Sequence, residues 1–328
     1  MKSINIPRRS LLRLAGAGCA IAACRLSFAA DQYPSRPIRI VVPYAPGGGT
    51  DVVGRALAQA MSKELGQPII IDNKAGGGTV IGSDLVSKSP PDGHTLLMTT
   101  SAIAINASLV KNLPYDTQKG FAEVALICHG PNVVVVRADS PYRTLQDIIK
   151  AAREKPGKLN YASSGNGSAV HLAAELLKSM AKIDVTHVPY RGAGPAYTDL
   201  LGGQVDMLFG TAGGVSKFVE TGKMRAIAVT SKTRSPAYKD VPAVSETLPG
   251  YEAEVWYGVF APGGTPAAVL ARLNAAIRKA AEAPDYRARL KHEGLTVAVN
   301  TPQEMTQFMR SEEQRWRKVV TEGRITTD

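Results

Sequence analysis

The stretch VVPYAPGGGTDVVGRALAQ, residues 41–59, predicts the fold, because a strand pattern, a glycine turn and a helical pattern follow one another in it. A second stretch, IIIDNKAGGGTVIGSDLVS at residues 69–87, repeats the same order 29 residues further along the chain. The two copies indicate successive parallel strands, each of which enters a helix through three glycines.

Both glycine turns favour an anion site. The first backbone N–H groups of a helix have no intrahelical acceptor and lie at the positive end of its dipole, and glycines let a ligand approach them closely. We expect Thr50 and Thr79 to cap the two helices. Both turns would lie at the carboxyl edge of one sheet, where α/β proteins bind ligands. The alternative is a pair of tight turns without a ligand, but the repeated GGG favours binding.

Nucleotide motifs do not fit these turns. The dinucleotide fingerprint needs glycine where Val52 and Ile81 stand, and the phosphate loop needs Gly-Lys-Ser/Thr where Gly54 is followed by Arg55. Catalytic signatures such as H-E-x-x-H and G-x-S-x-G are also missing, and the five histidines lack metal-ligand spacing. We therefore expect no enzyme, no metal and no cofactor, and we expect His171 to be structural.

The composition is typical of a soluble protein large enough for two domains, with 328 residues, 44% of them hydrophobic and 20% charged. Residues 1–30 hold five of the 39 Lys and Arg and none of the 28 acids, so the rest of the chain has a net charge of +6. That charge suits an anionic ligand, whereas the low aromatic content and the lack of dense basic blocks argue against nucleic acid.

The N-terminal segment resembles an export signal. Four basic residues precede a Gly/Ala-rich apolar stretch at 14–23, and PRRSLLRLAG is close to a twin-arginine signal. Cleavage after Ala29 would leave a soluble periplasmic protein, which we favour. Cleavage within IAAC, residues 21–24, would instead leave a lipid-anchored protein that begins at Cys24. Only Cys128 is certain to remain in the mature chain, and we expect it to be buried.

Strand and helix patterns alternate in two series. We expect strands at 38–44, 68–72, 95–100, 133–136, 159–163, 185–190, 205–210, 224–230 and 254–262, and helices at 51–65, 79–88, 145–155, 168–180, 265–283 and 301–320, with Thr144 as the cap of the third. This order predicts an α/β protein with two lobes, each a mostly parallel sheet flanked by helices, and a ligand cleft between them. We place lobe 1 at 31–128 plus 253–328 and lobe 2 at 129–252, with crossings near 128–133 and 250–258.

Lobe 2 has glycine turns of its own. YASSGNGSAVHL at 161–172 offers neutral donors for a carboxylate, although Ser168 alone would also suit a plain helix cap. PYRGAGPAYTDLL at 189–201 adds Arg191, which would attract an anion or remain a solvated surface charge.

The motifs resemble one family. YPSRPIRIVVPYAPGGGTDVVGRALAQ, HVPYRGAGPAYTDLLGGQVDMLF, GKMRAIAVTS and VWYGVFAPGGTP together look like the Bug-type solute receptors of tripartite tricarboxylate transporters, over nearly all of the mature chain. The resemblance implies a monomeric protein of the type II periplasmic binding kind, which closes on a small carboxylate and passes it to a membrane permease. Ligands of such receptors include di- and tricarboxylates, acidic amino acids and aromatic acids. A ligand sensor that signals to a membrane protein is the second interpretation, and a secreted α/β enzyme using Ser164 or His171 is the third.

The resemblance also implies the binding residues. They come from the turns of both lobes: Tyr44, Ala45, Gly47, Gly48, Gly49, Thr50, Asp51, Ala75, Gly76, Gly77, Gly78, Thr79, Thr99, Ser101, Ser163, Ser164, Asn166, Ser168, Tyr190, Arg191 and Gly192. One position departs from the family, since Gly210 stands where many members carry a polar residue. This makes an amino-acid ligand less favoured, and the small residues at 210–218 leave room for a bulkier acid. Gly48→Val and Gly77→Val are expected to abolish binding without unfolding the protein.

Overall fold

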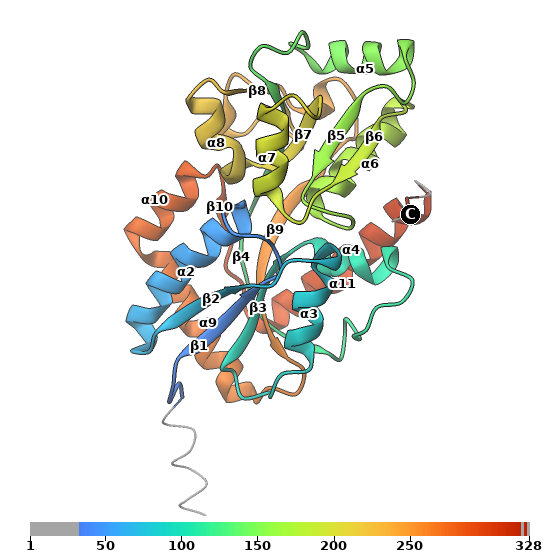
Figure 1. The fold of residues 1–328 in the computed structure, drawn as a ribbon. Helices are drawn as coiled ribbons and strands as arrows, with labels where there is room; N and C mark the ends of the chain where they lie inside the picture. The colour runs from blue at the N-terminus through green and yellow to red at the C-terminus, as the bar shows by residue number, and fades with distance from the viewer. Residues whose placement is uncertain (1–32, 323–324, 327–328) are drawn as a thin grey trace, which may run out of the picture.

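The computed structural model describes residues 33–322 and 325–326, so the predicted export signal lies outside the described residues. One curled sheet of ten strands runs through the molecule in the order β2-β1-β3-β9-β4-β7-β5-β6, with β8 and β10 also paired to β4. Helices flank the sheet in two lobes, one above the other in Figure 1. The predicted two-lobed α/β class is therefore confirmed.

Lobe 1 contains the N-terminal βα units and the C-terminal helices. Its elements are β1 (Ile38–Val42), α2 (Gly49–Leu65), β2 (Ile69–Asn73), η1 (Gly77–Thr79), α3 (Val80–Ser87), β3 (Thr95–Thr100), α4 (Ala102–Leu109), α9 (Ala267–Glu282), α10 (Pro284–His292), β10 (Thr296–Val297) and α11 (Pro302–Glu322). β1 pairs in parallel with both β2 and β3.

Lobe 2 repeats this arrangement. Its elements are α5 (Leu145–Glu154), β5 (Asn160–Ser163), α6 (Ala169–Ala181), β6 (Thr186–Pro189), α7 (Ala193–Leu201), β7 (Met207–Thr211), α8 (Ala212–Glu220), β8 (Met224–Val229), η2 (Pro236–Tyr238) and η3 (Val244–Glu246). β5 pairs in parallel with β6 and β7, as β1 does with β2 and β3. Each lobe therefore has its first strand inside, its second at the edge and its third toward the crossing strands.

Alternate residues of the strands pack on opposite faces of the sheet. In β1, Ile40 and Val42 share a core with Leu57 of α2 and Ile277 of α9, whereas Val41 belongs to the core of the other face, with α4 and α11. Burial on both faces explains why the strands read as continuous apolar runs rather than alternating ones.

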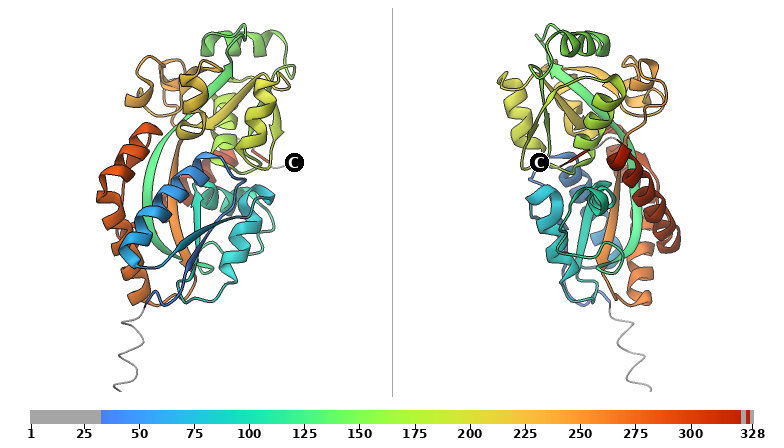
Figure 2. Two further views of the ribbon diagram at one scale, coloured as in Figure 1. Left: turned by 60° about the vertical axis from the view of Figure 1, so that its left-hand side comes forward. Right: turned by 90° about the vertical axis from the view of Figure 1, so that its right-hand side faces the viewer.

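Two long strands join the lobes. β4 (Phe121–Arg137) pairs with β9 (Glu254–Pro262) over its first part and with β7 and β8 over its last part. Figure 2 shows both strands crossing the junction side by side. The predicted strand at 133–136 is only the end of β4, and the predicted crossings fall in the middle of β4 and at the start of β9. The exact lobe boundaries stay a prediction, because β4 passes through both lobes without a break.

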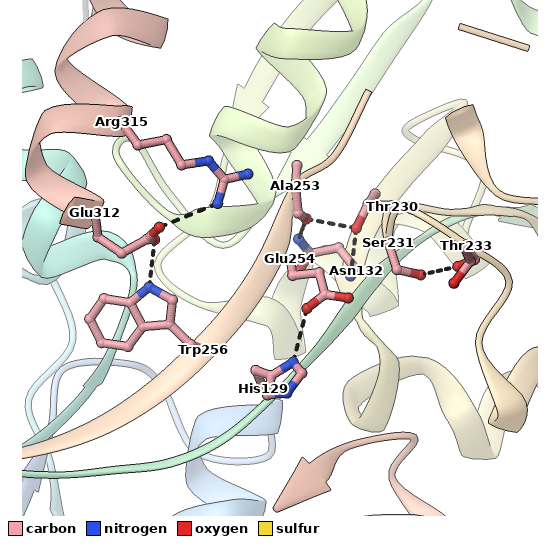
Figure 3. A network of polar contacts seen from close by, with 10 residues as sticks. All are labelled: His129, Asn132, Thr230, Ser231, Thr233, Ala253, Glu254, Trp256, Glu312 and Arg315. Atoms are coloured by element: carbon pink, nitrogen blue, oxygen red, sulfur yellow. Dashed lines mark hydrogen bonds and ion pairs between the residues drawn. The ribbon is translucent and has the colours of Figure 1, made fainter. Parts of the chain in front are cut away.

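Polar contacts hold the crossing strands together at the junction (Figure 3). The Asn132 side-chain amide donates to the Ala253 carbonyl at 3.0 Å, and the Thr230 hydroxyl donates to the same oxygen at 2.7 Å. His129 lies 2.9 Å from the Glu254 carboxylate. That hydrogen bond raises the pKa of His129. The strands are thus tied to each other close to the point where a hinge between lobes must bend.

The helix caps differ in part from the prediction. Thr144 caps α5 with a full capping box, as expected. α2 begins at Gly49 with Gly48 as its cap, so the prediction for Thr50 is wrong, since the chain turns into the helix two residues earlier. Thr79 does occupy the position before α3, but its φ is 82° and its side chain makes no capping bond. Its hydroxyl instead accepts from the Asn106 amide at 3.1 Å.

The helices α4, α8 and α10 lie outside the expected ones. The first five residues of α4 are all buried, so no polar face alternates with an apolar one, and α8 contains two glycines near its start. Tertiary packing, rather than local preference, decides these two segments. α10 does carry local signals, a proline at its first position and basic residues in its last turn.

Candidate ligand-binding cleft

A small cavity of about 30 Å³ lies between the lobes. Lobe 1 contributes the start of α2, and lobe 2 contributes the starts of α6 and α7 and the end of β7 just before α8. The strands before α2, α6 and α8, which are β1, β5 and β7, end near the cavity, as expected for the carboxyl edge of a parallel sheet. Four helix N-termini from two lobes therefore converge on one space.

The start of α2 approaches lobe 2 too closely for any side chain. A Cβ atom at position 49 would overlap the Thr211 hydroxyl and lie 3.1 Å from the Tyr257 hydroxyl. Glycine is thus required here by close approach, while Gly47 is required by its φ of 86°. Gly48, Gly49 and Thr50 all line the cavity, as predicted from the sequence.

Asp51 does not line the cavity and instead holds the turn in place. Its carboxylate accepts from the backbone N–H of Gly47 at 3.1 Å, the amide of Asn73 at 3.0 Å and the guanidinium of Arg55 at 3.0 Å. Burial alone would raise the pKa of Asp51, but the hydrogen bonds from these groups outweigh it and lower the pKa. The charged form therefore fixes the glycine turn.

A second, wider hollow of about 230 Å³ adjoins the cavity, because Tyr44 and Ser164 line both. We refer to the two spaces as the inner cavity and the outer hollow. The predicted residues found in the outer hollow are Ala75, Gly76, Gly77, Gly78, Thr79, Asn166, Tyr190, Arg191 and Gly192. The structure thus separates the two glycine turns: the first lines the inner cavity and the second lines the outer hollow.

The remaining predicted residues lie behind these walls. Ser163 lines the inner cavity, but its hydroxyl already makes hydrogen bonds within the protein. It lies 2.7 Å from Nε2 of His187 and accepts from the backbone N–H of Gly165 at 3.1 Å. Ser168 caps α6 and donates to the Gly165 carbonyl at 2.7 Å, which is the plain-cap alternative. Predicted residues outside both spaces are Ala45, Gly47, Asp51, Thr99, Ser101 and Ser168.

Two stacked histidines support the lobe 2 turn. The rings of His171 and His187 lie 4.2 Å apart, and Nδ1 of His171 accepts from Gly167 N–H at 3.2 Å. Burial, as the largest cause, lowers the pKa of His171 to about 4 and the pKa of His187 to about 3. Both rings are therefore neutral near pH 7. This confirms the structural role expected for His171.

The inner cavity has no ionised wall. Its lining consists of backbone, hydroxyl and apolar groups, without a lysine, arginine, histidine or acid among the described residues. Arg191 lies in the outer hollow, where it is exposed. An anion in the inner cavity would meet backbone N–H groups and hydroxyls only.

The lobes touch backbone to backbone around the outer hollow. A Cβ atom at Gly78 would overlap the carbonyl oxygen of Asn166, and one at Gly192 would lie 3.0 Å from the backbone nitrogen of Ala45. A cavity of about 30 Å³ has room for only a few waters. An organic acid can therefore enter only when the lobes separate.

Several lining residues were missed in the sequence. They are Ala169, Val170, Ala193, Ala196, Tyr197, Leu208, Phe209, Thr211 and Val255. Among these residues, only those at the end of β7 could have been recognised from the sequence. A buried strand is followed there by small residues, as it is in the predicted glycine turns. Gly210, noted for its departure from the family, also lines the cavity.

A family model described as "Tripartite tricarboxylate transporter family receptor" matches residues 53–324. Protein BugT of Bordetella pertussis is 35% identical over 315 residues, which cover 95% of this chain and 97% of BugT.

Solved structures with bound acids are also similar. MatC of Rhodopseudomonas palustris, solved with malate, is 35% identical with a TM-score of 0.84 over 88% of this chain and 100% of MatC. Another R. palustris protein, solved with adipate, is 33% identical with a TM-score of 0.86 over 90% of this chain and 99% of its own.

Proposed function

The chain belongs to the tripartite tricarboxylate transporter receptor family, and from that premise we propose that it captures a small organic carboxylate between its lobes and delivers it to a membrane permease. Such receptors bind solutes and catalyse no reaction. The proposal places the protein in the periplasm as a monomer after removal of its export signal.

The convergence of helix N-termini on the inner cavity supports this proposal most directly. Helices α2, α6, α7 and α8 all begin there, so the first turns of helices from both lobes, where N–H groups lack intrahelical acceptors, lie around one space. Each hydrogen bond to a charged group contributes about 1.5–3 kcal/mol, so a few of them offset the desolvation of one carboxylate. Malate and adipate in the similar structures are acids of the size expected.

We assign the carboxylate to the start of α2, next to Gly49 and Thr50. The Ser163–Ser168 turn would cover it from lobe 2 after closure, with Ser164 as the hydroxyl donor that reaches both spaces. The outer hollow would be the entrance, which closes when Gly78 meets Asn166.

The contacts of His171 weigh against an enzyme. Its Nδ1 atom accepts from Gly167 N–H and its ring stacks on His187, so it supports the turn rather than activating Ser164.

The described part of the chain contains no helix with the length and apolar character of a membrane span.

A thermal-shift panel tests the proposal. The chain without residues 1–30 would be heated with di- and tricarboxylic, amino and aromatic acids, each at a range of concentrations. A ligand at 100 times its Kd adds about 2.7 kcal/mol to the free energy of unfolding, which raises Tm by several degrees. The absence of any shift across the panel would refute carboxylate binding.

A further inference from the structure

A separate groove of about 520 Å³ lies at the junction of the lobes, outside the ligand-binding cleft. One wall is the lobe 2 segment 231–237, and the other is formed by α10 and β10 of lobe 1. The floor is formed by the crossing strands, with the side chains of His129 and Glu254 that are paired in Figure 3. We call this space the back groove. Its volume falls within the roughly 300–1,000 Å³ of sites that hold a ligand.

The back groove and the inner cavity lie on opposite faces of β9. Glu254 lines the groove, whereas the next residue, Val255, lines the cavity. Successive side chains of a strand point to opposite faces of its sheet. Because the two walls of the groove belong to different lobes, a rotation about the crossing strands that opens the cavity brings these walls together. The groove is therefore widest when the lobes are closed.

The end of α10 lies where the lobes meet. A Cβ atom at Gly213 of α8 would overlap the carboxylate of Glu293, the residue that follows α10. Figure 1 shows α10 beside α2 and below α8 of lobe 2. The position of this wall relative to lobe 2 thus depends on how far the lobes have closed.

The ionisable groups of the back groove are mostly basic. Within the described part of the chain, Glu254 is the one acid in its lining, and the basic side chains are those of His129, Arg234, Arg287 and Lys291. Two of these already have acidic partners. His129 lies 2.9 Å from the Glu254 carboxylate, and Arg234 lies 2.8 Å from that of Glu246.

The other two basic residues, Arg287 and Lys291, leave their charges uncompensated. Both are exposed, and neither side chain forms an ion pair or hydrogen bond with another described residue. They stand four residues apart on α10, so they lie on the same side of the helix. One wall of the groove therefore presents two free cations in a row.

A protein segment with carboxylates spaced along it matches this wall. Cations on the wall of a groove can flank a chain that lies in the groove, whereas a lipid surface favours cations on an open face. Ion pairs formed inside a groove are less screened by water than those on an open surface, so they contribute more to binding.

Resting on the carrier function proposed above, we propose that the back groove is the surface through which the closed receptor docks on an acidic segment of its membrane partner. Arg287 and Lys291 bind the carboxylates of that segment. Since the groove is widest in the closed form, an occupant fitted to it stabilises closure. The partner thereby binds the acid-loaded receptor more tightly than the empty one.

Fluorescence anisotropy with a labelled peptide of alternating Glu and Ala tests the docking site. The protein without residues 1–30 is titrated at low ionic strength, with and without the best acid of the panel. The peptide should bind about fivefold more tightly when the acid is present, and calorimetry should find the affinity for the acid raised by the same factor when the peptide is present. A peptide of alternating Lys and Ala should not bind.

Two double variants test the residues. Arg287→Gln/Lys291→Gln should weaken binding of the acidic peptide about tenfold or more, because two charged hydrogen bonds are lost, and should leave the affinity for the acid alone unchanged. Arg310→Gln/Arg317→Gln is the matched control, since these two arginines of α11 are also exposed but lie outside the groove. It removes the same net charge and should weaken peptide binding by no more than about twofold.

The outcomes separate this inference from the proposed function. An equal loss in the two double variants would show attraction by net charge alone and would refute the docking site. Absence of peptide binding, or equal peptide affinity with and without the acid, would refute it while acid binding stands. Binding to vesicles of phosphatidylglycerol that is lost in Arg287→Gln/Lys291→Gln, without binding of the peptide, would assign the surface to lipid and also overturn the inference. If no acid of the panel binds, the proposed function fails, and the comparison of the two double variants still decides whether the groove takes an acidic segment.

Discussion

Gly78→Ala should block closure of the lobes, and Gly77→Ala provides its matched control. Both glycines lie in the second GGGT turn with similar left-handed backbones, at φ 60° for Gly78 and 57° for Gly77. Only the Cβ atom at 78 would strike the other lobe, at the carbonyl oxygen of Asn166. A Cβ atom at 77 meets nothing closer than Val80 of its own lobe, at 3.5 Å.

The two variants should lose equal stability and unequal affinity. An alanine in a left-handed conformation costs about 1–2 kcal/mol, so Tm should fall by a few degrees in both. Gly78→Ala also keeps lobe 2 from reaching the ligand. Losing one hydrogen bond to a carboxylate costs about 1.5–3 kcal/mol, which weakens binding roughly 10- to 150-fold.

Calorimetric titration with the best acid from the panel measures the affinities, and small-angle scattering with and without that acid measures closure. Gly77→Ala should close and bind almost like the parent protein, whereas Gly78→Ala should stay extended. Equal Kd values for the two variants would show that the Gly78–Asn166 contact is not part of the bound state. The valine variant predicted from the sequence at Gly77 is now expected to act through backbone strain in the turn.

Three further outcomes can be checked. Thr144→Ala should lower the free energy of unfolding in urea by about 1 kcal/mol, because α5 loses its capping box, and should leave affinity unchanged. Ser164→Ala should weaken acid binding about three- to tenfold in calorimetry without a change in Tm, since Ser164 lines both spaces and its hydroxyl is the proposed donor. Acidification from pH 6.5 to 4 should destabilise the protein by up to about 1.4 kcal/mol per pH unit for each of His171 and His187, because only the unfolded chain protonates them there. In urea unfolding across that range, the double variant His171→Asn/His187→Gln should have a flatter profile, and an unchanged slope would contradict the assignment.

Local patterns were enough to predict most elements. β9 has the bounds expected from EVWYGVFAP, and the six helices with a clear apolar stripe or cap all form. The reason is that buried parallel strands and amphipathic helices carry their signal within a few residues. The glycine turns were placed correctly for the same reason.

Contacts between distant segments could not be predicted in this way. Tyr257 reaches the start of α2 only because β9 pairs with β3, and Glu293 reaches α8 only because α10 packs beside the junction. Neither residue stands near the glycine turns that were predicted to bind the ligand. Asp51 shows the converse, since it follows a predicted turn but holds that turn rather than facing the cavity.

The two GGGT turns look alike in sequence, but the order of the strands in the sheet places them at different spaces between the lobes. β1 lies inside its sheet and β2 at the edge, one strand further from the crossing strands, and β5 and β6 repeat this in lobe 2. The GGGT turn after β1 lines the inner cavity, whereas the GGGT turn after β2 and the turn after β6 line the outer hollow, which they share with residues 164–166 of the turn after β5. When lobes rotate about the crossing strands, points further away move more. The GGGT turn after β1 can therefore hold a ligand while the lobes are open, and the outer contacts, of Gly78 with Asn166 and of Gly192 with Ala45, form only at closure.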